Sequence, residues 1–369
     1  MSDVASLSRL RPATCQLPVS WYFDPEIFAR EMKLLFDAGS GYVGHELMVP
    51  NVGDYQTLAW MDHAKVLVRN QGGVELLSNV CRHRQSIMLE GRGNLENIVC
   101  PLHRWTYDLK GELLGAPRFP ESPCVKLHST PLASWNGLLF AGPRDPRKDL
   151  ADFGCSEDFD FSGYVLDRIE STDYACNWKT FIETYLEVYH VDYVHAGLGN
   201  FANCDDFHVR YGERHSVQVV TAKNGFTAPG TPVYRKWQEA CLRQLGGKTP
   251  KYGALWATYF PGLTLEWYPN VLVVSNLIPR SPELTTNVVE FYYPEEIVHF
   301  EREFVQAQQA AYAETAIEDD DICRRMDRGR KALWREGRDD AGPYQSPMED
   351  TVVHFHEWLR RGLGEEGGK

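Results

Sequence analysis

Two cysteines and two histidines lie close together in one stretch of the chain. His83 follows Cys81 after one intervening residue, and His103 follows Cys100 after two. Thiolate sulfur and imidazole nitrogen are the ligands that hold zinc, copper or iron in proteins. Either pair alone could consist of buried structural residues, but the two pairs together predict a metal site.

Two kinds of metal site use this ligand set. A structural zinc ion would take all four side chains around one metal. A Rieske [2Fe–2S] cluster would take both cysteines on one iron and both histidines on the other. The common zinc signatures are C-x-x-C and H-x3-5-H, whereas the order Cys-x-His … Cys-x-x-His is the Rieske order. The order of these ligands therefore favours the Rieske cluster.

A second group of possible ligands comprises Glu187, His190 and His195. On a helix, Glu187 and His190 would share a face, whereas His195 would lie roughly 140° around from His190. Both histidines could bind one ion only if the helix ended, bulged or distorted between them. Taken alone, they are read more simply as two ordinary histidines on an aromatic-rich helix.

The predicted cluster changes the interpretation of this second group. A Rieske cluster only conducts electrons, so the long remainder of the chain needs a function. A non-heme Fe(II) held by two histidines and one carboxylate accepts electrons and binds O2. The carboxylate would come from a downstream acidic run, which is otherwise typical of a solvated helix face. The candidates are Glu318, Asp319, Asp320 and Asp321.

Bulk properties restrict the class of protein. The chain has 369 residues, and this length predicts two domains. A formal charge of −13 argues against non-specific nucleic-acid binding. No apolar run approaches the length of a membrane span, and the N-terminus lacks the pattern of a secretory signal. Nine cysteines without a disulfide-like framework point to the cytoplasm.

The elements that must position these residues fall into three parts. Residues 21–40 read as an amphipathic helix with Asp24 as N-cap, Pro25 at the first helical position and Gly39 after its end. Residues 41–142 alternate short apolar segments with Gly, Asn and Asp turns, which predicts an all-β module. Within that module, "TYDLKGELLG" reads as a hairpin with its turn near Asp108 to Gly111.

The Pro- and charge-rich stretch 142–154 predicts a domain boundary. Beyond it, "TDYACNWKTFIETYLEVYHVDYVH" looks helical throughout. Helices and strands then follow in a pattern that predicts an α+β domain with an antiparallel sheet. The expected strands are 216–222, 263–269, 270–279 and 287–294, and the expected helices are 295–335 and 349–362.

The whole chain resembles a Rieske non-heme iron oxygenase, large (α) subunit. The resemblance rests on "CRHR…CPLHRWTYDLKGELLGAP", "NWKTFIETYLEVYHVDYVH", "FPGLTLEWYP" with "LIPRSP", and "EDDDICRRMDRG". It implies a cluster held by Cys81, His83, Cys100 and His103. It further implies a mononuclear iron held by His190, His195 and Asp319, with Asp320 as the alternative carboxylate.

The resemblance also implies an architecture. An N-terminal helical segment (1–40) would precede an all-β Rieske [2Fe–2S] domain (41–145). A catalytic mononuclear non-heme iron domain (150–369) would follow, with a helix-grip (START-like) antiparallel sheet and helices. Together these parts make an α+β protein.

In this family, an acidic residue three positions before the first iron histidine links a cluster histidine of one subunit to an iron histidine of the next. Here that residue is Glu187, where most members carry Asp, and Glu resembles the branch that acts on quaternary amines such as choline. Two further departures are Thr184 and Asp327, where many members carry Asn and Gln. The subunit-to-subunit route implies a ring of subunits, expected to be a homotrimer.

The resemblance implies a terminal oxygenase that uses O2 to hydroxylate or oxidatively dealkylate a small organic molecule. Electrons would come from NAD(P)H through a separate flavin- or ferredoxin-type reductase. We expect monooxygenation, with cis-dihydroxylation of an aromatic ring as the alternative. Two alternatives come from other functional classes: a Rieske electron-transfer protein without oxygenase chemistry, and a structural zinc protein. Candidate pocket residues are Tyr185, Phe207, Trp256, Tyr259 and Trp267.

Overall fold

The computed structural model describes residues 15–364 of the chain. Its contacts divide into two compact units. One unit comprises residues 40–148, and the other comprises residue 149 onwards together with the segment that precedes residue 40. Candidate residues of the cluster lie in the first unit, and candidate residues of the mononuclear iron lie in the second.

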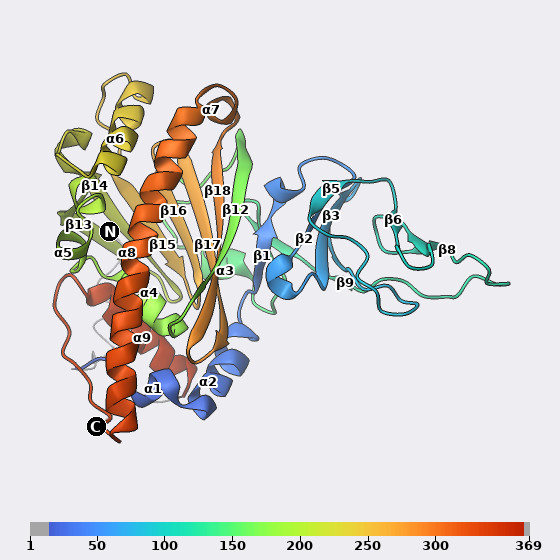
Figure 1. Cartoon of the computed structure of the whole chain (residues 1–369), viewed down its shortest axis with the longest axis horizontal. Coiled ribbons are helices and arrows are strands. Elements are labelled where there is room, and N and C mark those ends of the chain that lie inside the picture. The colour runs from blue at the N-terminus through green and yellow to red at the C-terminus, as the bar shows by residue number, and fades with distance from the viewer. Residues whose placement is uncertain (1–14, 365–369) are drawn as a thin grey trace. The chain divides into compact units, whose positions relative to one another are not determined.

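The unit of residues 40–148 is built from short antiparallel strands (Figure 1). A five-stranded sheet has the order β5-β2-β3-β4-β9, and two three-stranded sheets have the orders β1-β11-β10 and β6-β7-β8. The predicted hairpin is confirmed, because β7 pairs with β8 around a turn in which the Gly111 N–H donates to the Asp108 carbonyl. The bounds are β1 Tyr42–His45, β2 Asp54–Thr57, β3 Lys65–Asn70, β4 Gly73–Ser78, β5 Arg92–Asn94, β6 Ile98–Val99, β7 Thr106–Tyr107, β8 Leu113–Gly115, β9 Ser129–Thr130, β10 Ala133–Trp135 and β11 Leu138–Phe140, with 3-10 turns η3 Glu46–Met48 and η4 Ala59–Met61.

The other unit contains a seven-stranded antiparallel sheet of order β12-β18-β17-β16-β15-β14-β13. The expected strands are present, and three strands were missed: β12, β13 and β15. Glu266, Val273 and Phe291 lie in one row across β16, β17 and β18, so they share a face of the sheet. The bounds are β12 Tyr164–Tyr174, β13 Ala202–Tyr211, β14 His215–Ala222, β15 Ala254–Tyr259, β16 Leu263–Tyr268, β17 Val271–Ser281 and β18 Leu284–Pro294.

Helices cover this sheet, and the longest, α8, runs across it (Figure 1). The predicted helix over 295–335 is two helices, α7 and α8, and the predicted C-terminal helix is α9. The bounds are α4 Trp178–Leu186, α5 Val191–Val194, α6 Pro232–Gln244, α7 Glu295–Phe300, α8 Arg302–Arg335 and α9 Asp350–Gly362, with 3-10 turns η5 Leu198–Asn200 and η6 Lys223–Phe226. The short helix α3 (Pro146–Asp149) lies at the boundary between the two units in the sequence.

The segment before residue 40 forms two short helices rather than the single helix predicted over 21–40. α1 (Ser20–Phe23) ends where Asp24 adopts an extended backbone, and Asp24 then caps α2 (Pro25–Glu31) by accepting from the Glu26 N–H. The predicted N-cap at Asp24 and the first helical position at Pro25 are confirmed, whereas the prediction of one helix over 21–40 was wrong. A π-helical turn, η2 (Met32–Phe36), follows α2. The apolar side of this segment packs into a core shared with α4 and α9.

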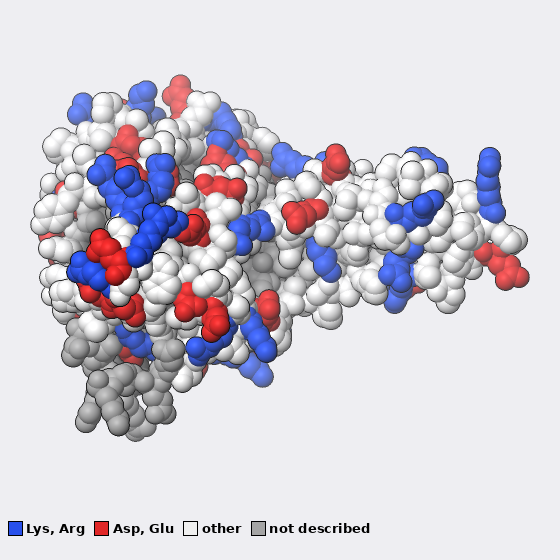
Figure 2. Space-filling view, turned by 60° about the horizontal axis from the view of Figure 1, so that its bottom comes forward, with Lys and Arg blue, Asp and Glu red and all other residues white. Residues whose placement is uncertain are grey.

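The charged surface is mixed. On the face drawn in Figure 2, Lys and Arg side chains lie among Asp and Glu side chains. None of the helices in residues 15–364 is both long and apolar enough to cross a membrane.

Candidate functional site

The Cys81 and Cys100 loops have the same backbone construction. In each loop, the cysteine N–H donates to a carbonyl five residues on, and the N–H four residues on donates back to the cysteine carbonyl. The residue four positions after each cysteine has a left-handed φ, 55° in one loop and 62° in the other. The donor–acceptor pairs are Cys81–Ser86 and Gln85–Cys81, and Cys100–Trp105 and Arg104–Cys100.

These loops place the sulfur atoms and the imidazoles at different depths. Cys81 and Cys100 are each 1% exposed and belong to the core of the unit. Burial, together with the neighbouring Cys81 thiol, raises the pKa of Cys100. By contrast, His83 is half-buried and His103 is exposed, with their ring centroids 4.7 Å apart. The structure thus brings all four predicted residues together as a sulfur pair and an imidazole pair.

This arrangement fits a cluster in which one iron takes sulfur ligands and the other takes nitrogen ligands. Nδ1 of His83 is buried without a hydrogen-bond partner among the described residues. Its ring stacks on Trp105, with centroids 4.9 Å apart and planes within 6°. A buried imidazole nitrogen is costly unless a donor or a metal engages it, so a metal ligand role suits His83.

In the other unit, the helix that leads to the second group of ligands stops before reaching them. The continuous helix predicted up to His195 was wrong, because α4 ends at Leu186 and Glu187 is extended (φ −98°, ψ 142°). The Glu187 carboxylate accepts a hydrogen bond from the backbone N–H of His190 (2.9 Å), and short α5 separates His190 from His195. α5 ends at Val194 and leaves His195 outside the helix (φ −107°, ψ 82°). This helix end between the two histidines meets the condition under which both can face one point.

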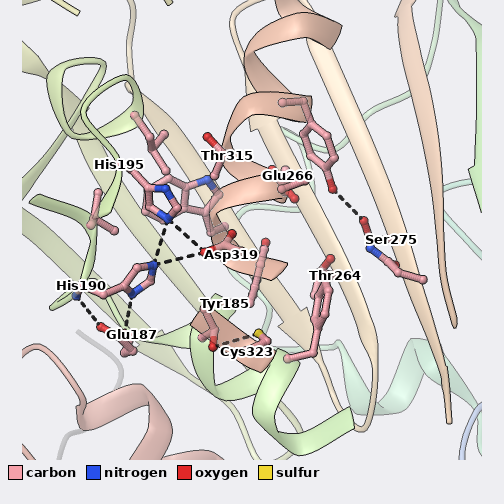
Figure 3. A pocket seen from close by; sticks show the side chains of 18 of the residues that line it. Tyr185, Glu187, His190, His195, Thr264, Glu266, Ser275, Thr315, Asp319 and Cys323 are labelled. Carbon is pink, nitrogen blue, oxygen red and sulfur yellow. Dashed lines mark hydrogen bonds and ion pairs between the residues drawn. The ribbon is translucent and has the colours of Figure 1, made fainter. Parts of the chain in front are cut away.

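Nε2 of His190, Nε2 of His195 and Oδ1 of Asp319 converge beside α8 (Figure 3). The two nitrogens are 3.1 Å apart, and the carboxylate oxygen lies 3.0 Å from His195 and 3.4 Å from His190. Three ligands at about 2.1 Å from one ion would be about 3.0 Å apart at right angles and about 3.4 Å apart at tetrahedral angles. The donor set therefore fits one metal ion with open positions.

Two further carboxylates hold the outer nitrogens of these rings. Glu187 interacts with Nδ1 of His190, and Oε2 of Glu318 lies 2.6 Å from Nδ1 of His195. Burial lowers the pKa of His190, but Asp319 and Glu187 outweigh it and raise the pKa to about 9. Burial likewise lowers the pKa of His195, but Asp319 and Glu318 outweigh it and raise that pKa. Burial raises the pKa of Asp319, but the two histidines outweigh it and lower that pKa. The site is therefore built to stabilise positive charge, which a metal cation would supply.

The other acidic residues of the run point elsewhere. Asp320 forms an ion pair with Arg324 (2.9 Å), and Asp321 forms one with Arg325 (2.7 Å). Successive residues on a helix are about 100° apart, so only part of an acidic run can face one point. Geometry thus favours Asp319 over Asp320. Sequence reasoning missed the contact between Glu318 and His195, although Glu318 was within the run that it singled out.

A cavity opens beside the three converging atoms, between α8 and the sheet (Figure 3). Of the five aromatic residues predicted to line it, Tyr185 and Trp256 do so. The prediction that Tyr259 and Trp267 line the cavity was wrong, because strand alternation turns their side chains to the face opposite Trp256 and Glu266. The prediction for Phe207 was also wrong, since its side chain packs against the core outside this lining. The lining residues that sequence reasoning missed include Tyr174, Tyr234, Trp237, Glu266, Tyr268 and Tyr312.

Comparison with known proteins assigns both units. Residues 41–131 match the Rieske [2Fe-2S] domain, and residues 161–365 match the ring hydroxylating alpha subunit (catalytic domain). A putrescine 2-hydroxylase of Ralstonia nicotianae is 62% identical over 98% of this chain and 99% of the relative. One of Bordetella bronchiseptica is 54% identical over 99% of this chain and 88% of the relative. A crystal structure of the quaternary ammonium Rieske monooxygenase CntA has the same fold, with a TM-score of 0.74 at 18% identity, covering 95% of this chain and 96% of that one.

The chain therefore belongs to the Rieske non-heme iron oxygenases, as a large (α) subunit. Its cofactors are a [2Fe–2S] cluster and a mononuclear iron, and it uses O2 to hydroxylate a small molecule. Monooxygenation is the favoured reaction, and the electrons come from a separate reductase.

Proposed function

We propose that this oxygenase hydroxylates a short aliphatic diamine, with putrescine as the first substrate to test, at the carbon next to an amine-bearing carbon. The observation that carries this proposal is the cavity beside His190, His195 and Asp319. Its described lining residues include aromatic rings and carboxylates but neither Lys nor Arg, which suits a cationic ligand. Two relatives that are 62% and 54% identical bear the name of that activity.

We assign the metal ligands as the sequence predicts them. His190, His195 and Asp319 would hold the mononuclear iron, and Cys81, His83, Cys100 and His103 would hold the cluster. When bound, the iron supplies O2 activation with electrons relayed by the cluster. The convergence of three ligand atoms at 3.0–3.4 Å supports the iron site, and the sulfur and imidazole pairs support the cluster site.

The chain's own residues position and shield the reacting groups. Glu187 and Glu318 hold the outer nitrogens of the two histidines, and these contacts fix which ring nitrogen faces the metal. The aromatic rings of Tyr185, Trp237 and Trp256 exclude water from the cavity and leave the aliphatic part of a substrate in apolar surroundings. The cavity thus orients the substrate while the metal carries out the oxidation.

We further propose that Glu187 is the residue through which this subunit receives electrons from a neighbouring copy. Its side chain is 16% exposed while it interacts with His190, so it can meet an approaching histidine. His103, an exposed cluster ligand, is the matching group on the other copy. Contact between identical chains at two different surfaces closes into a ring when the rotation between them allows it, and we propose that it does so here as a homotrimer.

The remaining partners follow from the chemistry. A flavin- or ferredoxin-type reductase would deliver electrons from NAD(P)H. The nine cysteines are all unpaired, which supports a reducing cytoplasm as the compartment. We propose no nucleic-acid partner, because a formal charge of −13 disfavours binding to phosphate backbones.

The test is turnover of the purified holoenzyme with a reductase, NADH and 18O-labelled O2. Putrescine should give a product with one added oxygen atom that carries the label, as judged by mass spectrometry. Choline and glycine betaine, offered in parallel, test for quaternary amines in place of the diamine. Absence of a labelled putrescine product from enzyme with both metal centres loaded would overturn the proposed substrate.

A further inference from the structure

Glu266 places a buried carboxyl group in the cavity beside the iron ligands. It lies on β16, is 5% exposed, and faces α8 across the cavity, with Thr264 on the same strand (Figure 3). The Tyr268 hydroxyl donates to Oε2 of Glu266 (2.6 Å), and the Trp256 indole N–H donates to the Tyr268 oxygen (3.0 Å). This relay fixes the carboxyl group in one orientation.

Glu266 has no basic Lys or Arg side chain beside it in the described lining of the cavity. The other carboxylates there, Glu187 and Asp319, are engaged with the histidines. Burial raises the pKa of Glu266 to about 7, and the charge of Asp319 adds to this effect while Tyr268 opposes it. Buried carboxylates are stable as ions when a cation pairs with them, so this one is suited to a cation that arrives from outside.

Aromatic groups surround the same carboxyl group. The pKa of both Tyr185 and Tyr312 is raised by burial, and the charge of Glu266 contributes to each shift. Tyr268 and Trp237, whose ring centroids are 5.2 Å apart, also line the cavity. Ring faces attract an ammonium group, and a carboxylate attracts it more strongly.

We infer that Glu266 binds one ammonium group of the substrate and thereby anchors an aliphatic amine beside the iron ligands. The inference rests on the proposed function in its choice of a diamine, but its ligand chemistry is that of any primary alkylammonium ion. It gives Glu266 a substrate-binding role distinct from those of the metal ligands and of Glu187.

The fold contains a matched control for this residue. Glu290 on β18 is 0% exposed and accepts a hydrogen bond from the Tyr292 hydroxyl (2.5 Å), which repeats the Glu-x-Tyr arrangement of Glu266 and Tyr268. Glu290 is adjacent to Phe291, which is in the same row as Glu266, so Glu290 lies on the opposite face of the sheet. Replacing its carboxyl group by an amide disturbs a similar buried pair without touching the cavity.

The experiment compares the wild type with Glu266→Gln and Glu290→Gln, each as holoenzyme with its iron content measured. Binding of putrescine, n-butylammonium and neutral n-butanol is followed by calorimetry, which needs no turnover. We expect Glu266→Gln to weaken binding of both cations by roughly 30-fold or more, the usual result of removing one partner of a buried charge pair. Binding of n-butanol by Glu266→Gln, and of every probe by Glu290→Gln, should stay within about twofold of wild type.

The results distinguish a failure of the anchoring role of Glu266 from a failure of the proposed function. If Glu266→Gln binds the cations as tightly as wild type, or if Glu290→Gln weakens cation binding equally, the anchoring role of Glu266 is wrong even when putrescine is hydroxylated. If n-butylammonium binds in a Glu266-dependent way while putrescine is neither bound nor hydroxylated, the anchor stands and the proposed diamine is wrong.

Discussion

The cluster loops and the iron site use histidine in opposite settings. His83 and His103 reach the surface of a small β unit, whereas His195 is 1% exposed beneath α8. Each iron-site histidine has its own carboxylate, Glu187 or Glu318. We therefore propose that the cluster histidines exchange electrons at a surface, while the iron-site histidines are held rigidly around an interior reaction.

The two sites also differ in how far apart their ligands lie along the chain. Both cysteines and both cluster histidines come from two loops within residues 81–105, so local hairpins suffice to assemble them. The iron site joins the segment after α4 to the middle of α8, and it forms only when α8 packs across the sheet. We therefore expect damage to the catalytic unit to spare the cluster.

The largest effect should come from replacing Asp319. Asp319→Ala removes the carboxylate that touches both histidines and should lower turnover about a thousandfold or more. The control is Asp320→Ala, which breaks an ion pair with Arg324 on the same helix and should change turnover by less than about twofold. Steady-state O2 uptake with reductase measures both. Equal losses in the two variants would show that the ligand is misassigned.

A smaller effect is expected at Glu187. Glu187→Gln keeps the size of the side chain but removes the charge that holds His190 and reaches toward the neighbouring copy. We expect both metal centres to remain loaded while oxidation of the reduced cluster by the iron site slows by about 10- to 100-fold. Single-turnover absorbance of the cluster measures that rate. Unchanged, coupled turnover would contradict the linking role.

Glu318 provides the contrast to Glu187. Glu318→Gln weakens the support of His195, and we expect iron affinity to fall by about tenfold with little change in electron transfer once iron is restored. Titration of the apo iron site with Fe(II), followed by the single-turnover assay, separates the two effects. A slow cluster oxidation in the reloaded Glu318→Gln enzyme would show that Glu187 has no special role.

The smallest effect on turnover, but a clear effect on stability, is expected at Glu183. Its buried carboxylate accepts hydrogen bonds from Tyr22 and from Arg330 (2.8 Å), and it lies 2.9 Å from Nε2 of His356. Burial raises the pKa of Glu183, but these partners outweigh burial and lower the pKa to about 2.

Because the folded-state pKa of Glu183 lies below its unfolded value, its stabilisation is present above about pH 4.5 and is lost as the pH falls toward about 2. Glu183→Gln should lower the free energy of unfolding at pH 7 by about 3 kcal/mol. Urea unfolding followed by tryptophan fluorescence should shift, while cluster absorbance should not. The control is Glu283→Gln, which breaks an exposed pair with Lys331. A shift in both probes would contradict the independence of the two units.

Local patterns predicted the β module better than the catalytic unit. The hairpin turn between Asp108 and Gly111 depends on neighbouring residues alone. The missed strands lack such signals: β13 is an edge strand with Asp205 and Asp206 on it, and β15 is a short, wholly buried run whose periodicity does not distinguish strand from helix. Tertiary packing determines these elements.

The candidate site shows the same limit. Spacing predicted that the helix must end or distort between His190 and His195 for the two to converge. It did not predict that α4 ends at Leu186 or that a separate short helix, α5, lies between the two histidines. Family resemblance singled out Asp319 within the acidic run. The roles of Glu318 and Glu266 could not be predicted, because they depend on which face of α8 or β16 is turned inward. Side-chain direction on packed elements is a property of the assembled fold.

Iron and acid-labile sulfide analysis tests the account most directly. Wild type should contain about three irons and about two sulfides per chain, with the EPR signal of a reduced Rieske cluster. Asp319→Ala should lose about one iron and no sulfide, and Cys81→Ser should lose about two irons and both sulfides while the catalytic unit still binds iron. An Asp319→Ala protein that retains all its iron, or a Cys81→Ser protein that retains its cluster, would contradict the assignment of the two centres.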